Sequence, residues 1–411
     1  MIKRMVLENF FSFGKREEID LNSEKNILVG INGSGKSNFL KAIRLLYEAV
    51  AGSDGLEKLF MKDWSGFDTV CNYSKTQADH IKISYEFNRE AIRNATNNKG
   101  YVFRTNPIYE ITIHRAGNSS YYLSEWIYCR SYKDITEEPF TFLQMKSAHG
   151  IISTRDEGKI GLQRYNETDD QISFKIQELV LRQIADPDRY YPLYTLKTAL
   201  EQITVYDYFN TTLSSPIRQL STYTVEQRLL QNGENLVQIL QRMKNHHSLE
   251  YEQIEELLKK INPMFKDISF DFIGSKSLLV LREKKLAKSV SVEHISDGTL
   301  RYLLLLAMLY NPQRGNLICI DEPEIGLHPD MINTIAKAID HASQMGTQVV
   351  VATHSPLLLN SFELEDVWIF EKNESNETVV NFKTEEDFSE EENFLVGQMW
   401  LSGKLGGIRW Q

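Results

Sequence analysis

The chain has 411 residues, of which 42% are hydrophobic and 25% are charged, and its formal net charge is −10 at pH 7. These values are typical of globular proteins, so the chain can form one large domain or two ordinary ones, each with a sizeable core. The negative charge argues against a surface that coats nucleic acid generally, although it does not exclude a local basic groove.

The cysteines and the apolar segments bear on the cellular compartment. Cys71, Cys129 and Cys319 are odd in number, lie far apart and form no C-x-x-C pair, which fits a reducing compartment. The most apolar run, 302–310, is about half as long as the ~20 residues of a membrane span. Residues 1–13 contain no small-residue cleavage site of a signal peptide. We therefore expect a soluble, cytoplasmic protein without a membrane partner.

Three short apolar stretches near the start of the chain predict β-strands, at 1–10, 18–21 and 26–29. The next stretch, 30–37, reads GINGSGKS and matches the pattern G-x-x-x-x-G-K-[ST]. A stretch of helical periodicity follows it directly and ends near Val50. Strand, glycine-rich loop and helix in this order are the context of a phosphate-binding P-loop.

The residue types of this loop explain the chemistry that it indicates. Glycines allow backbone N–H groups to turn inward around phosphates, and the helix N-terminus adds unpaired donors and the positive end of its dipole. Lys36 is expected to reach the β- and γ-phosphates, and the Ser37 hydroxyl to ligate Mg²⁺. We therefore expect ATP and Mg²⁺ as cofactors; the alternative is a strand–helix turn that binds nothing. The predicted nucleotide-binding residues are Gly30, Asn32, Gly33, Ser34, Gly35, Lys36, Ser37 and Asn38.

The middle of the chain changes its periodicity. Period-2 stretches predict antiparallel strands at 80–87, 108–115 and 121–129. Helical spacing then predicts four helices, at 171–184, 194–203, 233–245 and 249–261. After a hairpin at 267–282, helices and strands alternate again. We therefore predict an α/β domain split by a mainly helical insertion, with an N-terminal lobe at 1–150, the insertion at 151–265 and a C-terminal lobe at 266–411.

The most basic run of the sequence is 282–288. Such a run can line a groove for the phosphate backbone of DNA or RNA. No aromatic residue that could stack on a base lies within it, so a solvated hairpin tip is the favoured interpretation. Contact with DNA or RNA stays open at this point.

Asp321 and Glu322 end an apolar strand, 317–320, in the form of a Walker B site. A buried strand places Asp321 at its carboxyl end beside the P-loop, where it can hold Mg²⁺. Glu322 is the next residue and can polarise the attacking water as general base. Acidic residues at a strand end often only begin a surface loop, but the P-loop in the same chain favours the catalytic interpretation.

Ser296 and Gly298 precede an apolar helix, where they offer a hydroxyl and free N–H groups. They form either an ordinary N-cap or a second phosphate site. One nucleotide per P-loop does not need a second site in the same chain. A functional Ser296 therefore predicts contact with the γ-phosphate bound by another subunit.

A further strand, 347–352, is followed by Thr353 and His354. His354 at this position can donate to the γ-phosphate and sense its loss. A lone histidine at a strand end is more often structural, so this residue depends on the other elements for its interpretation.

In order, these elements are a P-loop, a long insertion, an S-x-G helix, an Asp-Glu strand and a His strand. This order resembles the ABC-type ATPase heads of the SMC/RecF/OLD group. More closely, 296–301, 321–329 (DEPEIGLHP), 353–358 (THSPLL) and the tail 399–407 are similar to the stand-alone bacterial AAA-family "predicted ATPases". Residues 9–14 resemble the stretch of these heads that lies near the nucleotide base, or else are plain strand-end packing.

The resemblance implies a P-loop NTPase fold and an ATPase that hydrolyses ATP to ADP and phosphate. It implies a homodimer or higher even oligomer that sandwiches ATP, with Ser296 and Gly298 capping the partner's nucleotide. Ser37 and Asp321 then hold Mg²⁺, and Glu322 and His354 are catalytic. Members occur beside separately encoded effectors such as nucleases or Toprim-like proteins, so the implied role is the regulatory motor or sensor of an anti-phage defence or DNA-processing complex.

Two alternatives remain: an ATP-dependent assembly scaffold with little turnover, and a DNA repair or maintenance ATPase of the RecF/SMC type. The chain departs from transporter subunits because its signature is Ser-Asp-Gly-Thr. Its insertion is too short for an SMC arm, and too few residues follow His354 for a Toprim domain. The glutamine of the Q-loop is not evident, and Gln144 is the candidate.

Overall fold

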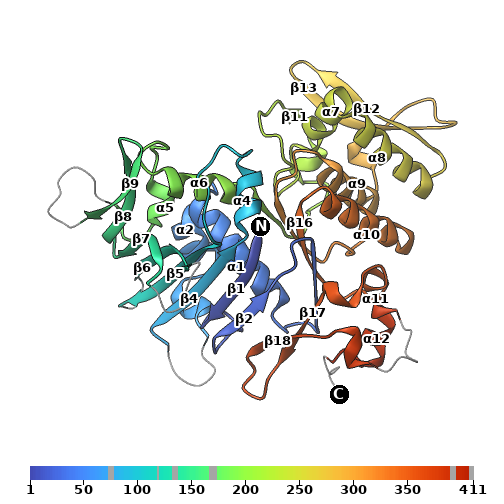
Figure 1. Ribbon diagram of the computed structural model, residues 1–411. Coiled ribbons are helices and arrows are strands. Elements are labelled where there is room, and N and C mark those ends of the chain that lie inside the picture. Colours follow the sequence, from blue (N-terminus) through green and yellow to red (C-terminus); the bar gives the residue numbers. More distant parts are fainter. Residues whose placement is uncertain (73–77, 118–119, 132–137, 166–173, 389–394, 407–411) are drawn as a thin grey trace. The chain divides into compact units, whose positions relative to one another are not determined.

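The computed structural model describes residues 1–72, 78–117, 120–131, 138–165, 174–388 and 395–406 (Figure 1). The chain forms two compact units, and each unit is built from three separate stretches. Unit 1 contains Met1–Ser23, Gly30–Ile203 and Trp368–Asn381, and unit 2 contains Glu24–Val29, Thr204–Val367 and Phe382–Gln411. The division of the head at residues 150 and 265 stays a prediction.

Unit 1 contains an eight-stranded sheet in the order β2-β1-β4-β5-β6-β7-β8-β9, drawn from blue to green in Figure 1. Each neighbouring pair of strands in this sheet is antiparallel. The strands are β1 (Ile2–Glu8), β2 (Glu17–Asp20), β4 (His80–Phe87), β5 (Pro107–Ala116), β6 (Ser120–Cys129), β7 (Phe140–Lys146), β8 (His149–Asp156) and β9 (Lys159–Tyr165).

The helices of unit 1 are mostly short. They are α1 (Lys36–Val50), α2 (Gly55–Glu57), the π-helical turn η1 (Lys58–Asp63), α3 (Phe67–Val70), α4 (Arg89–Ala95), α5 (Val180–Gln183) and α6 (Tyr191–Leu200). A hairpin of β17 (Val367–Lys372) and β18 (Thr378–Phe382) brings residues from the end of the chain into this unit.

The predicted strands at 80–87, 108–115 and 121–129 and the helix that follows the P-loop are confirmed. The predicted helix at 171–184 is wrong over its described part, since only Val180–Gln183 is helical; residues 171–173 lie outside the described residues. Helix α5 begins where it does because the N–H of Val180 donates to the buried carboxyl of Glu125 (2.6 Å). A tertiary contact of this kind is not visible in the local periodicity.

Unit 2 is built around parallel strands. Strands β10 (Ile203–Tyr206), β15 (Leu317–Asp321), β16 (Gln348–Thr353) and β3 (Lys25–Val29) lie in this order, and β16 pairs in parallel with both β15 and β3. Side chains from Leu317 to Ile320 and from Gln348 to Thr353 are all buried, as expected for parallel strands with both faces covered. The strand β10 was missed by the sequence analysis, which assigned residue 203 to a helix.

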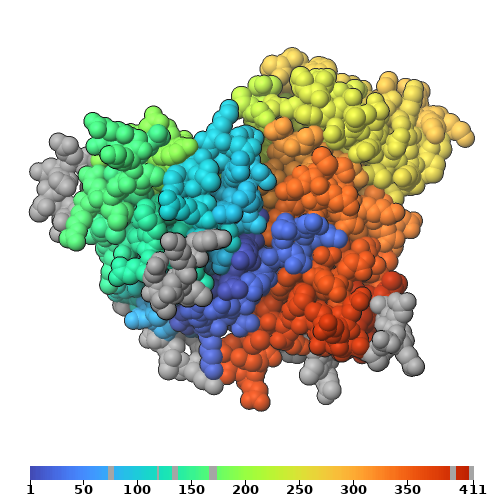
Figure 2. All heavy atoms as spheres, viewed as in Figure 1, coloured from blue at the N-terminus to red at the C-terminus, as the bar shows by residue number. Residues whose placement is uncertain are grey.

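Helices and a small antiparallel sheet complete unit 2. Figure 2 shows α7, α8, β12 and β13 in yellow as one packed body. The helices are α7 (Leu236–His246), α8 (Ser248–Ile261), α9 (Asp297–Tyr310), α10 (Pro329–Gln344), α11 (Pro356–Leu359) and α12 (Val396–Ser402). The strands are β11 (Ser221–Thr222), β12 (Phe265–Ile273), β13 (Lys276–Glu283) and β14 (Val290–Ser291), and short 3₁₀ turns lie at η2 (Pro216–Arg218), η3 (Val292–His294), η4 (Leu364–Asp366) and η5 (Glu385–Asp387).

The predicted helices at 233–245 and 249–261 and the predicted hairpin at 267–282 are confirmed by α7, α8 and the β12–β13 pair. Helix α9 is buried on all sides from Tyr302 to Tyr310, which confirms that this apolar run is a core helix. Among the described residues, no helix is both long enough and apolar enough to cross a bilayer.

The basic run at 282–288 is partly used in internal contacts. The Arg282 guanidinium donates to both carboxylate oxygens of Asp267 (2.6 and 2.9 Å), and the Lys284 ammonium donates to the carbonyl of Pro263 (3.0 Å). These contacts lower the number of cations that the run can offer to a phosphate backbone. They support the interpretation of a solvated turn over a nucleic-acid groove.

A buried carboxyl in the sheet of unit 1 predicts a pH-dependent stability. Burial raises the pKa of Glu125 from 4.5 to about 7. Between pH 4.5 and about 7, the folded state keeps a proton on the Glu125 carboxyl that the unfolded state has released. The contribution of this proton to the stability of the fold is therefore full below pH 4.5 and is lost as the pH rises through about 7. Glu125→Gln should remove this pH dependence, which amounts to about 3 kcal/mol in the free energy of unfolding.

Denaturant unfolding of wild type and variant from pH 5 to pH 8 measures the difference. Glu252→Gln, an exposed glutamate of α8, is the matched control and should follow the wild type. Parallel curves for wild type and Glu125→Gln would show that the native carboxyl is not neutralised by burial.

Candidate functional site

The glycine-rich loop of unit 1 has the backbone that a phosphate cradle requires. Gly33 and Gly35 have φ values of 80° and 116°, a left-handed conformation that residues with a Cβ rarely adopt. At Gly35, a Cβ would also collide with the Thr378 side chain. These two positions explain why the loop needs glycine, as the sequence motif predicted.

Helix α1 starts from this loop with an open N-terminus. Its N-cap is Gly35, which provides no side-chain cap, and its first turn holds no acidic residue. The N–H groups and the dipole of this end are therefore available to an anion. The Lys36 ammonium donates to the carbonyls of Gly30 (2.7 Å) and Ile31 (3.2 Å), and thus lies over the loop. This donor set fits a nucleotide phosphate, and Ser37 is exposed in the first turn of the same helix.

A second layer of polar contacts supports the loop from behind. The buried Thr378 hydroxyl of β18 donates to the carbonyl of Ser34 (2.6 Å) and contacts the Ser12 hydroxyl (2.7 Å). Ser12 in turn accepts from the Asn38 amide (2.8 Å). The stretch 9–14 therefore packs against the start of α1, and Thr378 is a supporting residue that the sequence analysis missed.

The parallel strands of unit 2 align the predicted Walker B carboxylate with the strand that leads to the loop. In the register of the sheet, Asp321 pairs with Ala352, Ala352 with Leu28, and Thr353 with Val29. The carboxyl ends of β15, β16 and β3 are therefore level. Since Gly30 follows Val29 in the chain, the P-loop begins at this edge of the sheet.

Just past these strand ends, His354 contacts two carboxylates, Glu322 and Glu324. The Nδ1 atom of His354 lies 3.0 Å from Oε1 of Glu322. The Glu324 carboxylate accepts from the Thr353 hydroxyl (2.5 Å) and from the N–H of His354 (3.2 Å). Glu324 thus fixes the backbone of the histidine, and Glu322 fixes its ring.

The backbone at Glu322 is left-handed, with a φ of 50°. For a residue other than glycine this conformation costs roughly 1–2 kcal/mol. The N–H of Glu322 donates to the Ala352 carbonyl (2.8 Å), which continues the β15–β16 pairing by one residue before the chain turns. Strain at this position is consistent with a functional carboxylate.

The contact with Glu322 also restricts what His354 can do. When Nδ1–H donates to an ionised carboxylate, the other nitrogen, Nε2, is an acceptor in the neutral ring. Nε2 can donate to a phosphate oxygen only when the ring is doubly protonated. A γ-phosphate sensor at His354 therefore needs the imidazolium form.

Ser296 is the N-cap of α9, where its hydroxyl accepts from the N–H of Thr299 (3.2 Å), and it is exposed. A Cβ at Gly298 would press on the carbonyl of Gly326 in the loop after β15. Arg301 donates to the neighbouring carbonyl of Ile325 (3.1 Å). Within unit 2, the S-x-G helix is therefore packed against the loop that follows Asp321 and Glu322.

Gln144 gains no support as a Q-loop residue. It is exposed on β7, opposite Trp126 and Ile151 in the sheet register. Among the described residues that line the hollow containing Gln144, no P-loop residue occurs. The tail resemblance at 399–407 falls partly on α12, and Gly407 lies outside the described residues.

Comparison with known proteins decides the family. The family model described as "AAA ATPase domain" matches residues 1–359. The chain belongs to this AAA ATPase family. It is an ATP-hydrolysing enzyme, and the predicted resemblance and the predicted activity are confirmed.

The ATPase is similar to proteins of the SMC and OLD types. It is 27% identical to the Old nuclease of Escherichia phage P2 over 154 residues, 32% of this chain and 25% of that protein. The chain thus spans about a quarter of this relative. A solved Smc head bound to the C-winged helix domain of ScpA matches with a TM-score of 0.54 and 16% identity, covering 94% of this chain and 98% of that chain.

A second Smc head, with an extended coiled coil and bound to the C-terminal domain of ScpA from Pyrococcus furiosus, also has a TM-score of 0.54. Its identity is 14%, and the match covers 98% of this chain and 99% of that one. These likenesses show the fold. The predicted P-loop NTPase fold of an ABC-type head is confirmed.

Thr378 gives a test of the support behind the P-loop. Thr378→Val keeps the shape of the side chain and removes the hydrogen bond to the Ser34 carbonyl. Loss of one such bond, about 1 kcal/mol, should weaken ATP binding about fivefold. A titration with a fluorescent ATP analogue measures this, with Thr222→Val, an exposed threonine of β11, as control. Equal affinity in both variants would remove Thr378 from the site.

Proposed function

We propose that this ATPase binds ATP with Mg²⁺ at the P-loop and cycles between a free state and an ATP-sandwich dimer. In each half of the sandwich, the residues 30–38 hold the triphosphate, and Ser37 and Asp321 hold the metal. Mg²⁺ bound there neutralises charge on the phosphates during transfer to water. The open N-terminus of α1 and the exposed Ser37 support this assignment.

Glu322 acts as the general base in this proposal. Its carboxylate is oriented by the contact with His354, and its backbone is turned out of the strand by a left-handed φ of 50°. In the proposed site, His354 contacts Glu322 through Nδ1 and donates through Nε2 to an incoming γ-phosphate. When the phosphate leaves, the histidine keeps only its carboxylate contacts, and this change is the signal that resets the dimer.

The single observation that carries the dimer is the exposure of Ser296 at the N-terminus of α9. Among the described residues, the hydrogen bonds of its hydroxyl are to Thr299 in the same helix turn. An exposed helix N-terminus with a serine and a close-packed Gly298 is suited to a partner's γ-phosphate. The chain is therefore proposed to be a homodimer or a higher even oligomer.

For the biological role, we propose the regulatory motor or sensor of an anti-phage defence or DNA-processing complex. Similarity to part of the Old nuclease of a phage supports a nucleic-acid context. The Smc heads of similar fold are bound to domains of ScpA, so heads of this fold can carry partner proteins. The effector, a nuclease or Toprim-like protein, is proposed to be encoded separately. An assembly scaffold with little turnover is the second candidate.

Glu322→Gln tests the proposal. General-base catalysis contributes about 10²–10⁴-fold, so the variant should lose at least 100-fold in kcat while it still binds ATP. Sedimentation with ATP and Mg²⁺ should show a stable dimer of the variant, and ADP should leave it monomeric. Such a trap distinguishes the cycling motor from a scaffold.

Glu256→Gln, an exposed glutamate of α8, is the matched control and should behave as wild type. Unchanged turnover in Glu322→Gln would show that the base is another residue. Wild-type turnover of only a few ATP per hour, with an ATP-dependent dimer, would favour the scaffold.

A further inference from the structure

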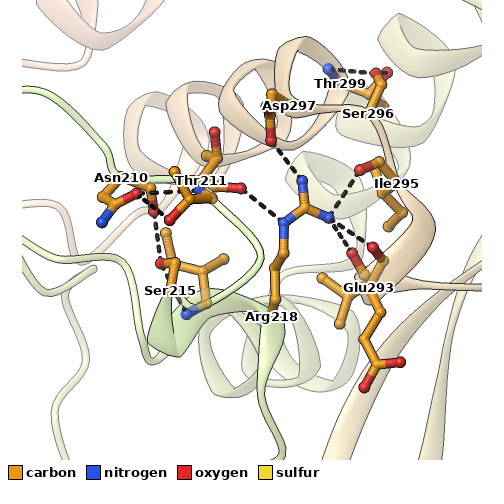
Figure 3. Close-up of polar contacts among 12 residues, drawn as sticks. Asn210, Thr211, Ser215, Arg218, Glu293, Ile295, Ser296, Asp297 and Thr299 are labelled. Atoms are coloured by element: carbon orange, nitrogen blue, oxygen red, sulfur yellow. Dashed lines mark hydrogen bonds and ion pairs between the residues drawn. The ribbon is translucent and has the colours of Figure 1, made fainter.

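One arginine outside all recognised motifs is tied to the S-x-G element. Arg218 ends the 3₁₀ turn η2, and its side chain is only 3% exposed. Figure 3 shows its guanidinium between the loop around Thr211 and the segment that leads to Ser296. All of these residues belong to unit 2.

The guanidinium uses its donors on two sides. Nε donates to the carbonyl of Thr211 (2.7 Å). Nη1 donates to the carbonyls of Val292 (2.5 Å), Glu293 (3.3 Å) and Ile295 (2.8 Å). Nη2 donates to Oδ1 of Asp297 (2.7 Å). These bonds satisfy carbonyls of a segment that is a short 3₁₀ turn, and so they fix the chain immediately before Ser296.

The anchor on the other side is itself rigid. The Ser215 hydroxyl donates to the Asn210 carbonyl (2.6 Å), and the Asn210 side chain accepts from the N–H of Thr212 (3.1 Å). Thr211 and Ser215 are buried. The Arg218 guanidinium is therefore held by the loop 210–215, whose own hydrogen bonds within the described part of the chain do not involve α9.

The ion pair with Asp297 addresses an electrostatic problem. Asp297 occupies the first residue of α9, between Ser296 and Gly298, and is 63% exposed. A free carboxylate there would repel the γ-phosphate that the proposed sandwich brings to this helix end. Arg218 compensates this charge and keeps the carboxylate on the side of the helix that faces η2.

We propose that Arg218 is a positioning residue of the ATPase, which holds the Ser296–Gly298 element in place and neutralises Asp297 so that this element can accept the triphosphate of a second copy of the chain. This inference rests on the proposed sandwich dimer. It assigns to the segment around η2 the role of making a helix end with a carboxylate competent for anion binding.

The experiment uses full-length protein with Glu322→Gln as background, so that ATP is not consumed. The dimer dissociation constant with ATP and Mg²⁺ is measured by sedimentation, and the affinity for a fluorescent ATP analogue is measured under the same ionic strength. Arg218→Met should raise the dimer constant at least tenfold, because the loop before α9 is released and Asp297 is uncompensated. Affinity for the analogue in the monomer should stay within twofold.

Adding Asp297→Asn to Arg218→Met gives the readout that a merely structural arginine would not move. Removal of the repelling charge should recover at least threefold of the lost dimer affinity. If Arg218→Met does not fold, Arg218→Lys takes its place. The lysine keeps the charge but cannot span Thr211 and the 292–295 carbonyls, so it should weaken the dimer at least threefold, and Asp297→Asn should then give no recovery.

Two results would overturn the inference: Arg218→Met with the dimer affinity of its background, or Arg218→Met without recovery by Asp297→Asn. The failure of the dimer proposal is distinct from these. If the Glu322→Gln background itself does not dimerise with ATP, no phosphate is shared between copies, and both proposals fall.

Discussion

The parallel register of β3, β16 and β15 is the constraint on which the site depends. Because a parallel strand delivers its next residue at the same edge as its neighbour, the end of β3, the end of β16 and Asp321 at the end of β15 are aligned without any dedicated contact. Strand β3, from the start of the chain, thus ends at the same edge of the sheet as β15 and β16, which lie about 290–320 residues later. Burial of both faces of these strands makes a slip of this register costly.

The sequence predicted most of this edge because its signals are local. Each of its elements can be identified from neighbouring residues in the sequence: the P-loop, the apolar strand before Asp321 and the strand before His354. The elements that the sequence missed depend on partners elsewhere in the fold. Strands β8 and β9 show no regular alternation of buried and exposed residues, so a period of two does not identify them. Glu125 sets the start of α5 from a strand 55 positions away in the sequence.

The same distinction separates the predicted site residues from the missed ones. Glu322 and His354 stand at strand ends and could be named, but their direct contact follows from the fold. Glu324 was within reach of sequence reasoning, since a second carboxylate two residues after Glu322 is visible in DEPEIGLHP. Arg218 was not, because an arginine beside Ser-Pro-Ile carries no signal until its donors are seen to meet Asp297 and the carbonyls before it.

The hydrogen bond from Thr378 to the Ser34 carbonyl joins residues 344 positions apart. A ribosome that has added Ser34 must therefore add another 344 residues before the hydroxyl that supports this loop exists. Domains generally fold in the order in which they are synthesised, but unit 1 is completed only when residues 368–381 have emerged. We therefore expect nascent chains that stop before residue 368 to leave the nucleotide loop incompletely supported, so that ATP binding begins only after this segment has emerged.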